Sequence, residues 1–227
     1  MAQREINLAQ MIDHTLLKPD MALSALNSLI DEAIEYNFFS VCIPPHYVSH
    51  AHQKLRDREP KVCTVVGFPL GYSHTNTKIF ETQLAIDQGA QEVDCVINIT
   101  ALKNNEISFL KNEVSSLLRA TSGKTLKIIL ETSLLTNEEK LTACKICAEH
   151  GVHFVKTSTG FSTGGATAED VKLLKEATLG KCLVKASGGI RDLKTAQKMI
   201  EAGASRLGTS SGVAIINNTS INEDNSY

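Results

Sequence analysis

Short apolar segments alternate along the chain with longer segments of helical period, and this alternation constrains the fold more than any other feature. The apolar segments are rich in Val and Ile and recur roughly every 30 residues, which is typical of repeated βα units around a parallel sheet. Eight such units close into a TIM (β/α)8 barrel, and an open doubly wound sheet is the competing architecture. The count of eight favours the barrel. The expected strands are Met11–Leu16, Ser40–Ile43, Val62–Val66, Glu92–Ile97, Lys127–Glu131, His153–Thr157, Leu183–Ser187 and Arg206–Thr209.

Capping residues mark several of the helices expected between these strands. Asp20 precedes a helical segment over Met21–Tyr36, and Thr136 with Glu139 has the spacing of a capping box. Asp192 precedes another segment of helical period. These local signals agree with an alternating α/β chain.

Composition excludes several classes of protein. The chain has 227 residues, 42% of them hydrophobic, and a net charge of −2, so it lacks the basic excess of a nucleic-acid surface. The segment MAQREINLAQ has no signal-peptide core, and no run approaches the roughly 20 apolar residues of a membrane span. We therefore expect a cytoplasmic protein with no nucleic-acid or membrane partner. No linker divides the chain, so we expect one domain over residues 1–216 and a polar, flexible tail over residues 217–227.

Cysteines and histidines do not form a convincing metal motif. Cys144 and Cys147 make a CxxC inside a helical pattern, and no second CxxC accompanies it. His50 and His52 are two residues apart and would not share a helix face. Cys42 is expected to pack in the core or to line the mouth of the barrel. We expect no metal and no other cofactor.

Two lysines at the ends of apolar segments carry the chemistry. Lys156 in HFVKTSTGF and Lys185 in CLVKASGGIR each lead into a turn rich in Gly, Ser and Thr. A buried strand disfavours an ammonium group, because desolvation penalises the charged form. The second cation would favour the uncharged, nucleophilic form of the first, which could then attack a carbonyl. Such a pair indicates Schiff-base chemistry.

Two turns have the composition of a phosphate site. One spans residues 187–192 (SGGIRD) and the other residues 208–212 (GTSSG). Glycines let backbone N–H groups point at an anion, and barrels commonly bind phosphate at the loops after the seventh and eighth strands. A third turn, over residues 159–165, could add amides or move as a lid. Together with the lysines, these turns indicate an aldolase that acts on a phosphorylated sugar.

Seven motifs, in the same order over residues 11–216, resemble deoxyribose-phosphate aldolases. They are DHTLLKP from Asp13, VCIPP from Val41, VVGFP from Val65, EVD from Glu92, LKIILET from Leu126, FVKTSTGF from Phe154 and VKASGGIR from Val184. The resemblance implies a TIM barrel and metal-free class I chemistry. It also implies reversible cleavage of 2-deoxy-D-ribose 5-phosphate into D-glyceraldehyde 3-phosphate and acetaldehyde, in the catabolism of deoxyribonucleosides. Family members are often homodimers, so a homodimer is expected.

The resemblance also implies roles for individual residues. Lys156 would form the Schiff base, Lys185 would perturb it, and Asp94 would relay protons. Phe161 is a departure, because some members carry a lysine there, and this puts the strength of phosphate binding in question. The candidate substrate and phosphate site, drawn from the turns and the motifs together, consists of Asp13, Thr15, Thr157, Gly160, Gly188, Gly189, Arg191, Gly208, Ser210 and Ser211.

Several alternatives stay open at the level of sequence. Asp13 and Thr15 could hold Lys185, hold substrate hydroxyls or serve the structure alone. The terminal Tyr227 could enter the site and relay protons, as in some family members, or belong to an ordinary tail. The chain could instead be a phosphosugar isomerase, or a binding module that keeps only the phosphate cradle. A covalent adduct on Lys156 would separate the aldolase from both.

Overall fold

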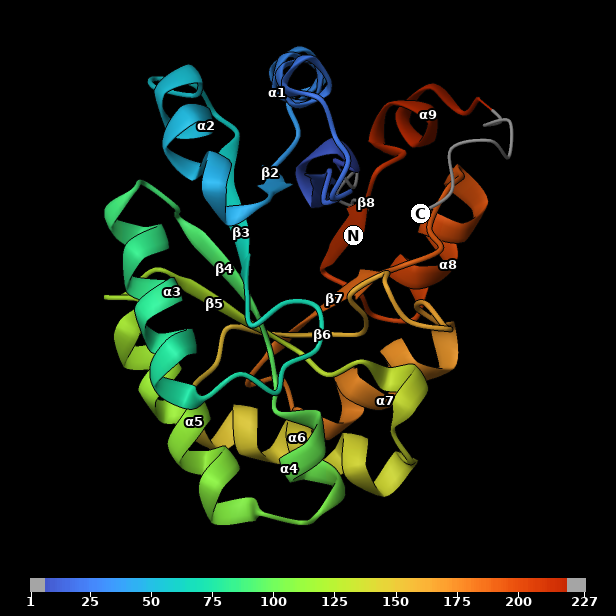
Figure 1. Cartoon of the computed structure of the whole chain (residues 1–227). Coiled ribbons are helices and arrows are strands. Elements are labelled where there is room, and N and C mark those ends of the chain that lie inside the picture. The colour runs from blue at the N-terminus through green and yellow to red at the C-terminus, as the bar shows by residue number, and fades with distance from the viewer. Residues whose placement is uncertain (1–6, 220–227) are drawn as a thin grey trace.

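The computed structural model describes residues 7–219, which form eight parallel strands closed into a barrel in the order β1 to β8. Helices surround the strands (Figure 1). The strands are β1 (Ile12–Thr15), β2 (Ser40–Ile43), β3 (Lys61–Val66), β4 (Glu92–Val96), β5 (Thr125–Ile129), β6 (Phe154–Lys156), β7 (Leu183–Ser187) and β8 (Arg206–Thr209). Pairing of β1 with β8 closes the barrel. The predicted TIM barrel is therefore confirmed, and all eight expected strands form with small changes at their ends.

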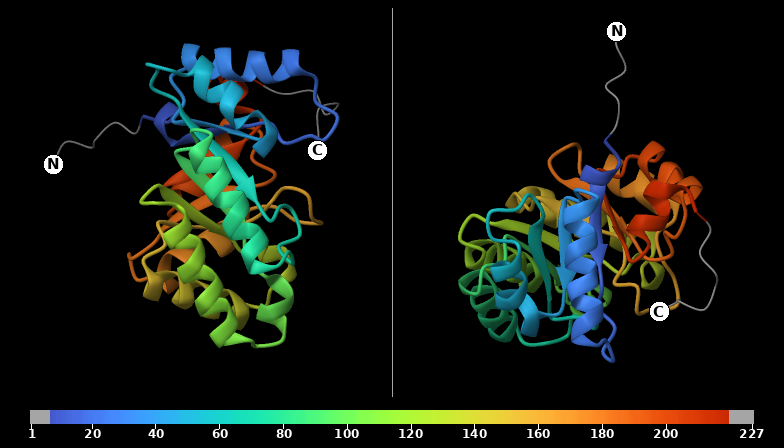
Figure 2. Two further views of the ribbon diagram at one scale, coloured as in Figure 1. Left: turned by 60° about the vertical axis from the view of Figure 1, so that its left-hand side comes forward. Right: turned by 90° about the horizontal axis from the view of Figure 1, so that it is seen from above.

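The helices within the described residues follow the strands in chain order and cover the outside of the barrel (Figure 2). They are α1 (Leu23–Glu35), α2 (Val48–Lys54), α3 (Thr75–Asp87), α4 (Ile99–Lys103), α5 (Ile107–Ala120), α6 (Asn137–His150), α7 (Ala168–Ala177), α8 (Leu193–Glu201) and α9 (Gly212–Asn217), with 3-10 turns at Ala9–Met11, Pro45–Tyr47 and Thr132–Leu134. None of the helices within residues 7–219 combines the length and the apolarity that crossing a bilayer requires.

Most of the helix caps predicted from the sequence form in the structure. Thr136 and Glu139 form the predicted capping box at the start of α6, and the side chain of Asp192 accepts a hydrogen bond from Thr195 N at the start of α8. The prediction for α1 was wrong by two residues, because Ala22 and not Asp20 is the N-cap. Side-chain capping is therefore absent at α1, which buries Leu26, Leu29, Ile30 and Ala33 to hold its position.

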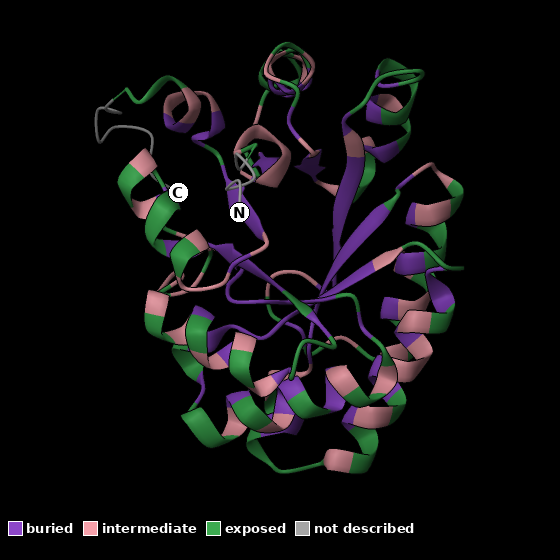
Figure 3. Ribbon diagram, turned by 180° about the vertical axis from the view of Figure 1, so that it is seen from behind, coloured by how far each residue is buried: buried purple, intermediate pink, exposed green. Residues whose placement is uncertain are grey.

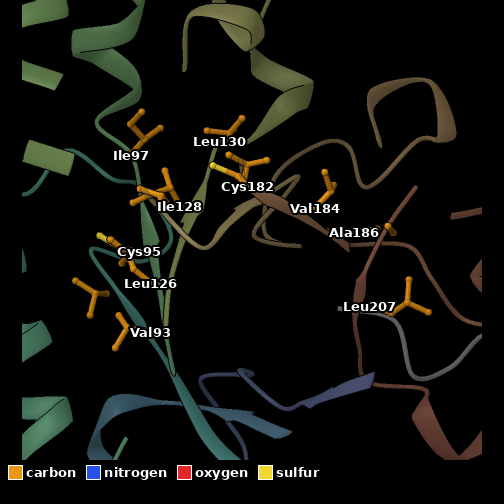
Figure 4. Packing of buried hydrophobic residues seen from close by; sticks show 14 of the residues in the cluster. Val93, Cys95, Ile97, Leu126, Ile128, Leu130, Cys182, Val184, Ala186 and Leu207 are labelled. Atoms are coloured by element: carbon orange, nitrogen blue, oxygen red, sulfur yellow. The ribbon is translucent and has the colours of Figure 1, made fainter. Parts of the chain in front are cut away.

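The apolar core lies between the strands and the helices and not inside the barrel. Alternate strand residues such as Val93, Leu126 and Val184 are fully buried in one large hydrophobic cluster together with helix residues (Figure 4). The strands are buried along almost their whole length, whereas the outer helix faces are exposed (Figure 3). The intervening strand residues point inward, and from β4 to β8 many of them carry charge. From β4 to β8, the inner face of the barrel is therefore largely charged or polar, although these segments are rich in Val and Ile.

The proposed division into a domain of residues 1–216 and a tail stays a prediction. Helix α9 continues one residue past the proposed boundary. Tyr227 lies outside the described residues, so its role also stays a prediction.

Candidate active site

Asp94 lies at the centre of a cluster of lysines inside the barrel. The Oδ2 atom of Asp94 accepts hydrogen bonds from Lys156 Nζ and Lys185 Nζ, each at 2.8 Å, and its Oδ1 atom accepts one from Lys127 Nζ at 2.8 Å. The four residues come from four consecutive strands. Asp94 on β4 is the register partner of Lys127 on β5, and Lys156 on β6 is the register partner of Lys185 on β7. The two predicted lysines and the predicted carboxylate therefore meet at one point, together with a third lysine.

Charge interactions in this cluster outweigh the effect of burial. Burial alone would raise the pKa of Asp94, but the ammonium groups of Lys127, Lys156 and Lys185 hold it well below the usual range. Burial alone would lower the pKa of Lys185, but Asp13 and Asp94 more than offset this and raise it. Asp94 is therefore a permanent anion and Lys185 a permanent cation in the free protein near neutral pH.

A second set of charges continues the cluster toward the N-terminal ends of the strands. Lys127 Nζ lies 2.5 Å from Glu92 Oε2, and Arg206 Nη1 donates to Asp13 Oδ1 at 2.8 Å and to Glu92 Oε2 at 3.3 Å. Asp13 Oδ2 also lies 2.5 Å from Lys185 Nζ. Of the three roles suggested for Asp13, the structure shows the contact with Lys185.

Sequence patterns did not single out Lys127, Glu92 or Arg206. Each lies in a segment that was correctly expected to be a strand, but none was selected as a candidate site residue. The signal that could have found them is the period of two along a strand. Glu92 and Asp94 share a face, and so an inward Asp94 implies an inward Glu92 that needs a cation.

A cavity lies at the C-terminal ends of β1, β6, β7 and β8, and Lys156 is at its inner end. Lys156 lines the cavity and is 3% exposed, whereas the side chains of Lys127 and Lys185 are wholly buried. The lining residues are Thr15, Leu17, Lys156, Thr159, Gly160, Ser187, Gly188, Gly189, Ile190, Arg191, Gly208, Thr209 and Ser210. Most of the candidate phosphate residues are among them.

Thr157 and Ser211 do not line this cavity. Thr157 Oγ1 donates to Ser187 O and accepts from Ser187 N, which ties β6 to β7. Ser211 lies at the start of α9, and its backbone N–H donates to Thr209 Oγ1. Both residues support the walls of the cavity from behind.

Glycines shape the wall of the cavity. Gly188 and Gly189 have φ values of +88° and +78°, a conformation that residues with a Cβ rarely adopt. A Cβ at Gly208 would collide with the Ser187 hydroxyl and lie 2.9 Å from Lys185 Cε. The turn after β8 thus approaches β7 closely because it has no side chain at this point.

Ser187 is a further cavity residue that the sequence analysis did not select. Its side chain is buried and lines the cavity, and its Oγ atom has no hydrogen-bond partner among residues 7–219. A buried hydroxyl without a partner is costly, so Ser187 offers a hydrogen bond to a ligand. Only its position within the SGG turn hinted at this.

Glu131 anchors the turn that follows Lys156. Its carboxylate accepts hydrogen bonds from the backbone N–H and the hydroxyl of Thr159, and Phe161 N donates in turn to Thr159 Oγ1. Burial raises the pKa of Glu131. Phe161 also packs edge-on against Phe68, with ring centroids 5.2 Å apart, so an aromatic contact stands where some relatives carry a cation.

Cys42 lies inside the barrel and does not line the cavity. It is fully buried in a small cluster with Leu17, Cys63 and Val65, which agrees with the core-packing expectation. Among the described residues, Cys42, Cys63 and Asp94 hold ligand atoms within 4.8 Å of one another. Three ammonium groups already occupy the Asp94 carboxylate, so a metal ion at this point would have to displace them.

The closed barrel and the cavity that ends at a lysine define an α/β-barrel enzyme. The chain belongs to the DeoC/LacD family of aldolases, whose family model matches residues 7–218. It is therefore a lyase of the aldolase type, as the sequence motifs predicted.

Individual relatives agree with this assignment. Deoxyribose-phosphate aldolase 1 of Oceanobacillus iheyensis is 51% identical over 212 residues, which cover 93% of this chain and 96% of the relative. A solved structure described as QR15, an aldolase, superposes with a TM-score of 0.90 at 42% identity, covering 94% of this chain and 96% of that one. The deoxyribose phosphate aldolase of Aeropyrum pernix, described as tetrameric, superposes with a TM-score of 0.86 at 33% identity, covering 92% and 89%. The predicted resemblance is thus confirmed.

Proposed function

We propose that the chain reversibly cleaves 2-deoxy-D-ribose 5-phosphate into D-glyceraldehyde 3-phosphate and acetaldehyde through a Schiff base on Lys156. The names of its relatives support this substrate. One observation supports Lys156 as the nucleophile: of the three lysines on Asp94, it is the one that lines the cavity. The proposed chemistry uses side chains only and needs no metal or cofactor.

The proposed reaction begins with the neutral amine of Lys156. It attacks the C1 aldehyde of the open-chain sugar, and loss of water gives a protonated imine. The C2–C3 bond then breaks, its electron pair passes to the imine nitrogen, and the C3 hydroxyl loses its proton as glyceraldehyde 3-phosphate leaves. Protonation of the enamine at C2 and hydrolysis of the imine release acetaldehyde and restore Lys156.

Asp94 and Lys185 are proposed to handle protons during these steps. One Asp94 oxygen accepts hydrogen bonds from both Lys156 and Lys185, so a proton can pass between the two nitrogens along short hydrogen bonds. The strongly lowered pKa of Asp94 keeps it ionised while the three lysines surround it. Asp94 therefore acts in this proposal as the bridge of a relay and as a fixed negative charge beside the imine.

The phosphate group is proposed to bind at the glycine-rich end of the cavity. Gly188, Gly189 and Ser210 line the cavity, and Arg191 adds a cation to the lining. A cavity lined by both Lys156 and these turns suits a substrate with an aldehyde at one end and a phosphate at the other.

A negative charge in the phosphate end should impair the phosphorylated substrate selectively. Ser210→Asp is expected to raise KM for 2-deoxy-D-ribose 5-phosphate about tenfold or more, because a carboxylate repels phosphate. Cleavage of unphosphorylated 2-deoxyribose should change about twofold at most. Steady-state kinetics with both sugars measure the effect.

Ser122→Asp is the matched control. Ser122 is exposed in the turn between α5 and β5, at the end of the barrel opposite the cavity, so the same charge there should leave both substrates unaffected. Equal losses on the two sugars in Ser210→Asp would contradict the proposed phosphate site. Isomerisation of a pentose phosphate without acetaldehyde release would favour the isomerase alternative.

The remaining parts of the proposal concern its setting. We propose a role in deoxyribonucleoside catabolism in the cytoplasm, as the family resemblance implies. Assembly from more than one copy is supported by the relative described as tetrameric, and a homodimer stays the predicted state. Size-exclusion chromatography with light scattering tests it.

A further inference from the structure

Lys127 is held more completely than the other lysines of the cluster, although it reaches no cavity. Its Nζ atom donates hydrogen bonds to Asp94 Oδ1 at 2.8 Å and Cys63 Sγ at 3.3 Å, and it forms ion pairs with Glu92 Oε2 at 2.5 Å and Asp13 Oδ2 at 3.8 Å. Lys127 binds the Asp94 oxygen that Lys156 and Lys185 do not use. This contact fixes the carboxylate so that its other oxygen faces the two remaining lysines.

The connected charges around Asp94 balance only when Lys156 is neutral. Within residues 7–219, the connected ion pairs around Asp94 comprise three carboxylates and four cationic side chains. The groups that balance one another are Asp13, Glu92, Asp94, Lys127, Lys185 and Arg206. Lys156 is the surplus cation, and it is also the one that lines the cavity.

We infer that Lys127 is a positioning residue for the reaction: it orients Asp94 and supplies the fixed positive charge that lets Lys156 act as a neutral amine. This inference rests on the proposed Schiff-base function and adds to it a residue two steps removed from the cavity. If Lys127 is removed, the interior has one excess negative charge, and a protonated Lys156 restores the balance. The variant should then need a higher pH for full activity.

Other titratable groups face the same space and do not change this expectation. Cys63 Sγ donates to Asp94 Oδ1 at 3.2 Å, and burial raises the pKa of the Cys63 thiol well above its usual value, so Cys63 stays neutral. The Cys42 thiol lies in the same small cluster, and a hydrogen bond with Cys63 lowers the pKa of Cys42. Glu131 lies two residues past the end of β5, where Thr159 holds its carboxylate. Burial raises the pKa of Glu131, and the charge of Lys156 partly offsets that rise. None of these groups contacts Lys156 Nζ within hydrogen-bond distance among the described residues.

The test compares the pH dependence of kcat/KM in variants whose charge changes have opposite sign. In Lys127→Met the acid limb of the profile should move up by about one pH unit, with roughly a tenfold loss of kcat/KM at low pH. In Glu92→Gln, which removes an anion from the same network, the acid limb should move down. The double variant restores the charge balance and should bring the limb back toward that of the parent enzyme. Ionisation of the substrate phosphate is common to all four enzymes and cancels.

Lys78→Met is the control for loss of a buried lysine. Lys78 is also wholly buried, and its Nζ atom binds Glu113 Oε1 at 3.0 Å and Val96 O at 2.9 Å outside the barrel interior. This variant should lose stability and keep the parental pH profile. The inference is overturned if Lys127→Met behaves like Lys78→Met, or if Glu92→Gln moves the limb upward or leaves it in place. Should Lys127→Met fail to fold, Glu92→Gln and the double variant still decide the outcome.

Failure of this inference differs from failure of the proposed function. If the function is wrong, the parent enzyme itself does not cleave 2-deoxy-D-ribose 5-phosphate or forms no adduct on Lys156. If only the inference is wrong, the parent enzyme does both, and the acid limbs of the variants coincide.

Discussion

Lys185→Met is expected to lower kcat at pH 7 by about 100-fold and to regain part of that loss as the pH rises. Lys156 Nζ and Lys185 Nζ lie 2.8 Å from the same oxygen of Asp94, which keeps the two nitrogens within about 5.6 Å of each other. At that separation and an effective dielectric constant near 20, their repulsion is about 3 kcal/mol, or roughly two powers of ten. Without Lys185, the amine of Lys156 stays protonated and cannot attack the aldehyde.

Steady-state rates between about pH 6 and pH 10 measure this effect, and thermal unfolding shows whether the variant is folded. Substrate binding should change little, because Lys185 is wholly buried and does not line the cavity. A variant with a near-parental rate at pH 7 would contradict the proposed role of Lys185. So would a loss that stays constant as the pH rises.

Asp94→Asn is expected to have the second large effect, on both rate and stability. The asparagine cannot neutralise Lys127, Lys156 and Lys185, so kcat should fall about 10²- to 10⁴-fold and the free energy of unfolding by about 3–5 kcal/mol at pH 7. Formation of the Schiff-base adduct on Lys156 should be reduced less than cleavage of the substrate. The neighbouring ammonium groups still favour a neutral amine on Lys156, whereas the proton transfers during cleavage need the Asp94 carboxylate.

The stability loss should depend on pH in a defined direction. The pKa of Asp94 is lowered in the folded state, so its contribution is present above the unfolded pKa and is lost as the pH falls toward the folded pKa. The difference in unfolding free energy between the parent enzyme and Asp94→Asn should have its largest value above about pH 5 and should decrease below about pH 4. Denaturant unfolding at several pH values measures it.

Glu113→Gln is the matched control for a buried carboxylate. Glu113 is wholly buried and pairs with Lys78 between α3 and α5, away from the cavity. This variant should lose stability and keep kcat. If Asp94→Asn kept its rate as Glu113→Gln is expected to do, Asp94 would be a structural carboxylate only.

Much of this site could be predicted because its residues follow local patterns. Lys156 ends β6 and Lys185 lies in the middle of β7, and the turns after β7 and β8 contain the glycines that a phosphate cradle needs. In a barrel, such strand ends meet at one face whatever their distance in sequence. The lysine pair and most of the cavity wall could therefore be inferred without coordinates.

The network beneath the lysines could not be predicted, because it depends on contacts between distant strands. Arg206 and Asp13 are 193 residues apart in the chain, and Lys127 meets Cys63 across 64 residues. The local sequence of Lys127 places it on a strand but does not identify the groups that it contacts. Thr157 shows the converse case. It follows Lys156 in the sequence, but its hydroxyl donates a hydrogen bond to Ser187 O and the residue does not line the cavity. The local sequence pattern predicts where a residue lies along its strand, whereas the closure of the barrel determines which residues it contacts.

Reductive trapping with acetaldehyde and borohydride, followed by peptide mapping with mass spectrometry, tests the central claim most directly. The cavity reaches Lys156, whereas Lys127 and Lys185 are sealed behind it. The expected result is a two-carbon unit on the peptide that contains Lys156, no comparable adduct on Lys127 or Lys185, and no labelling in Lys156→Met. Stable labelling of another lysine with Lys156 unmodified, or full aldolase activity in Lys156→Met, would contradict a Schiff base at this residue.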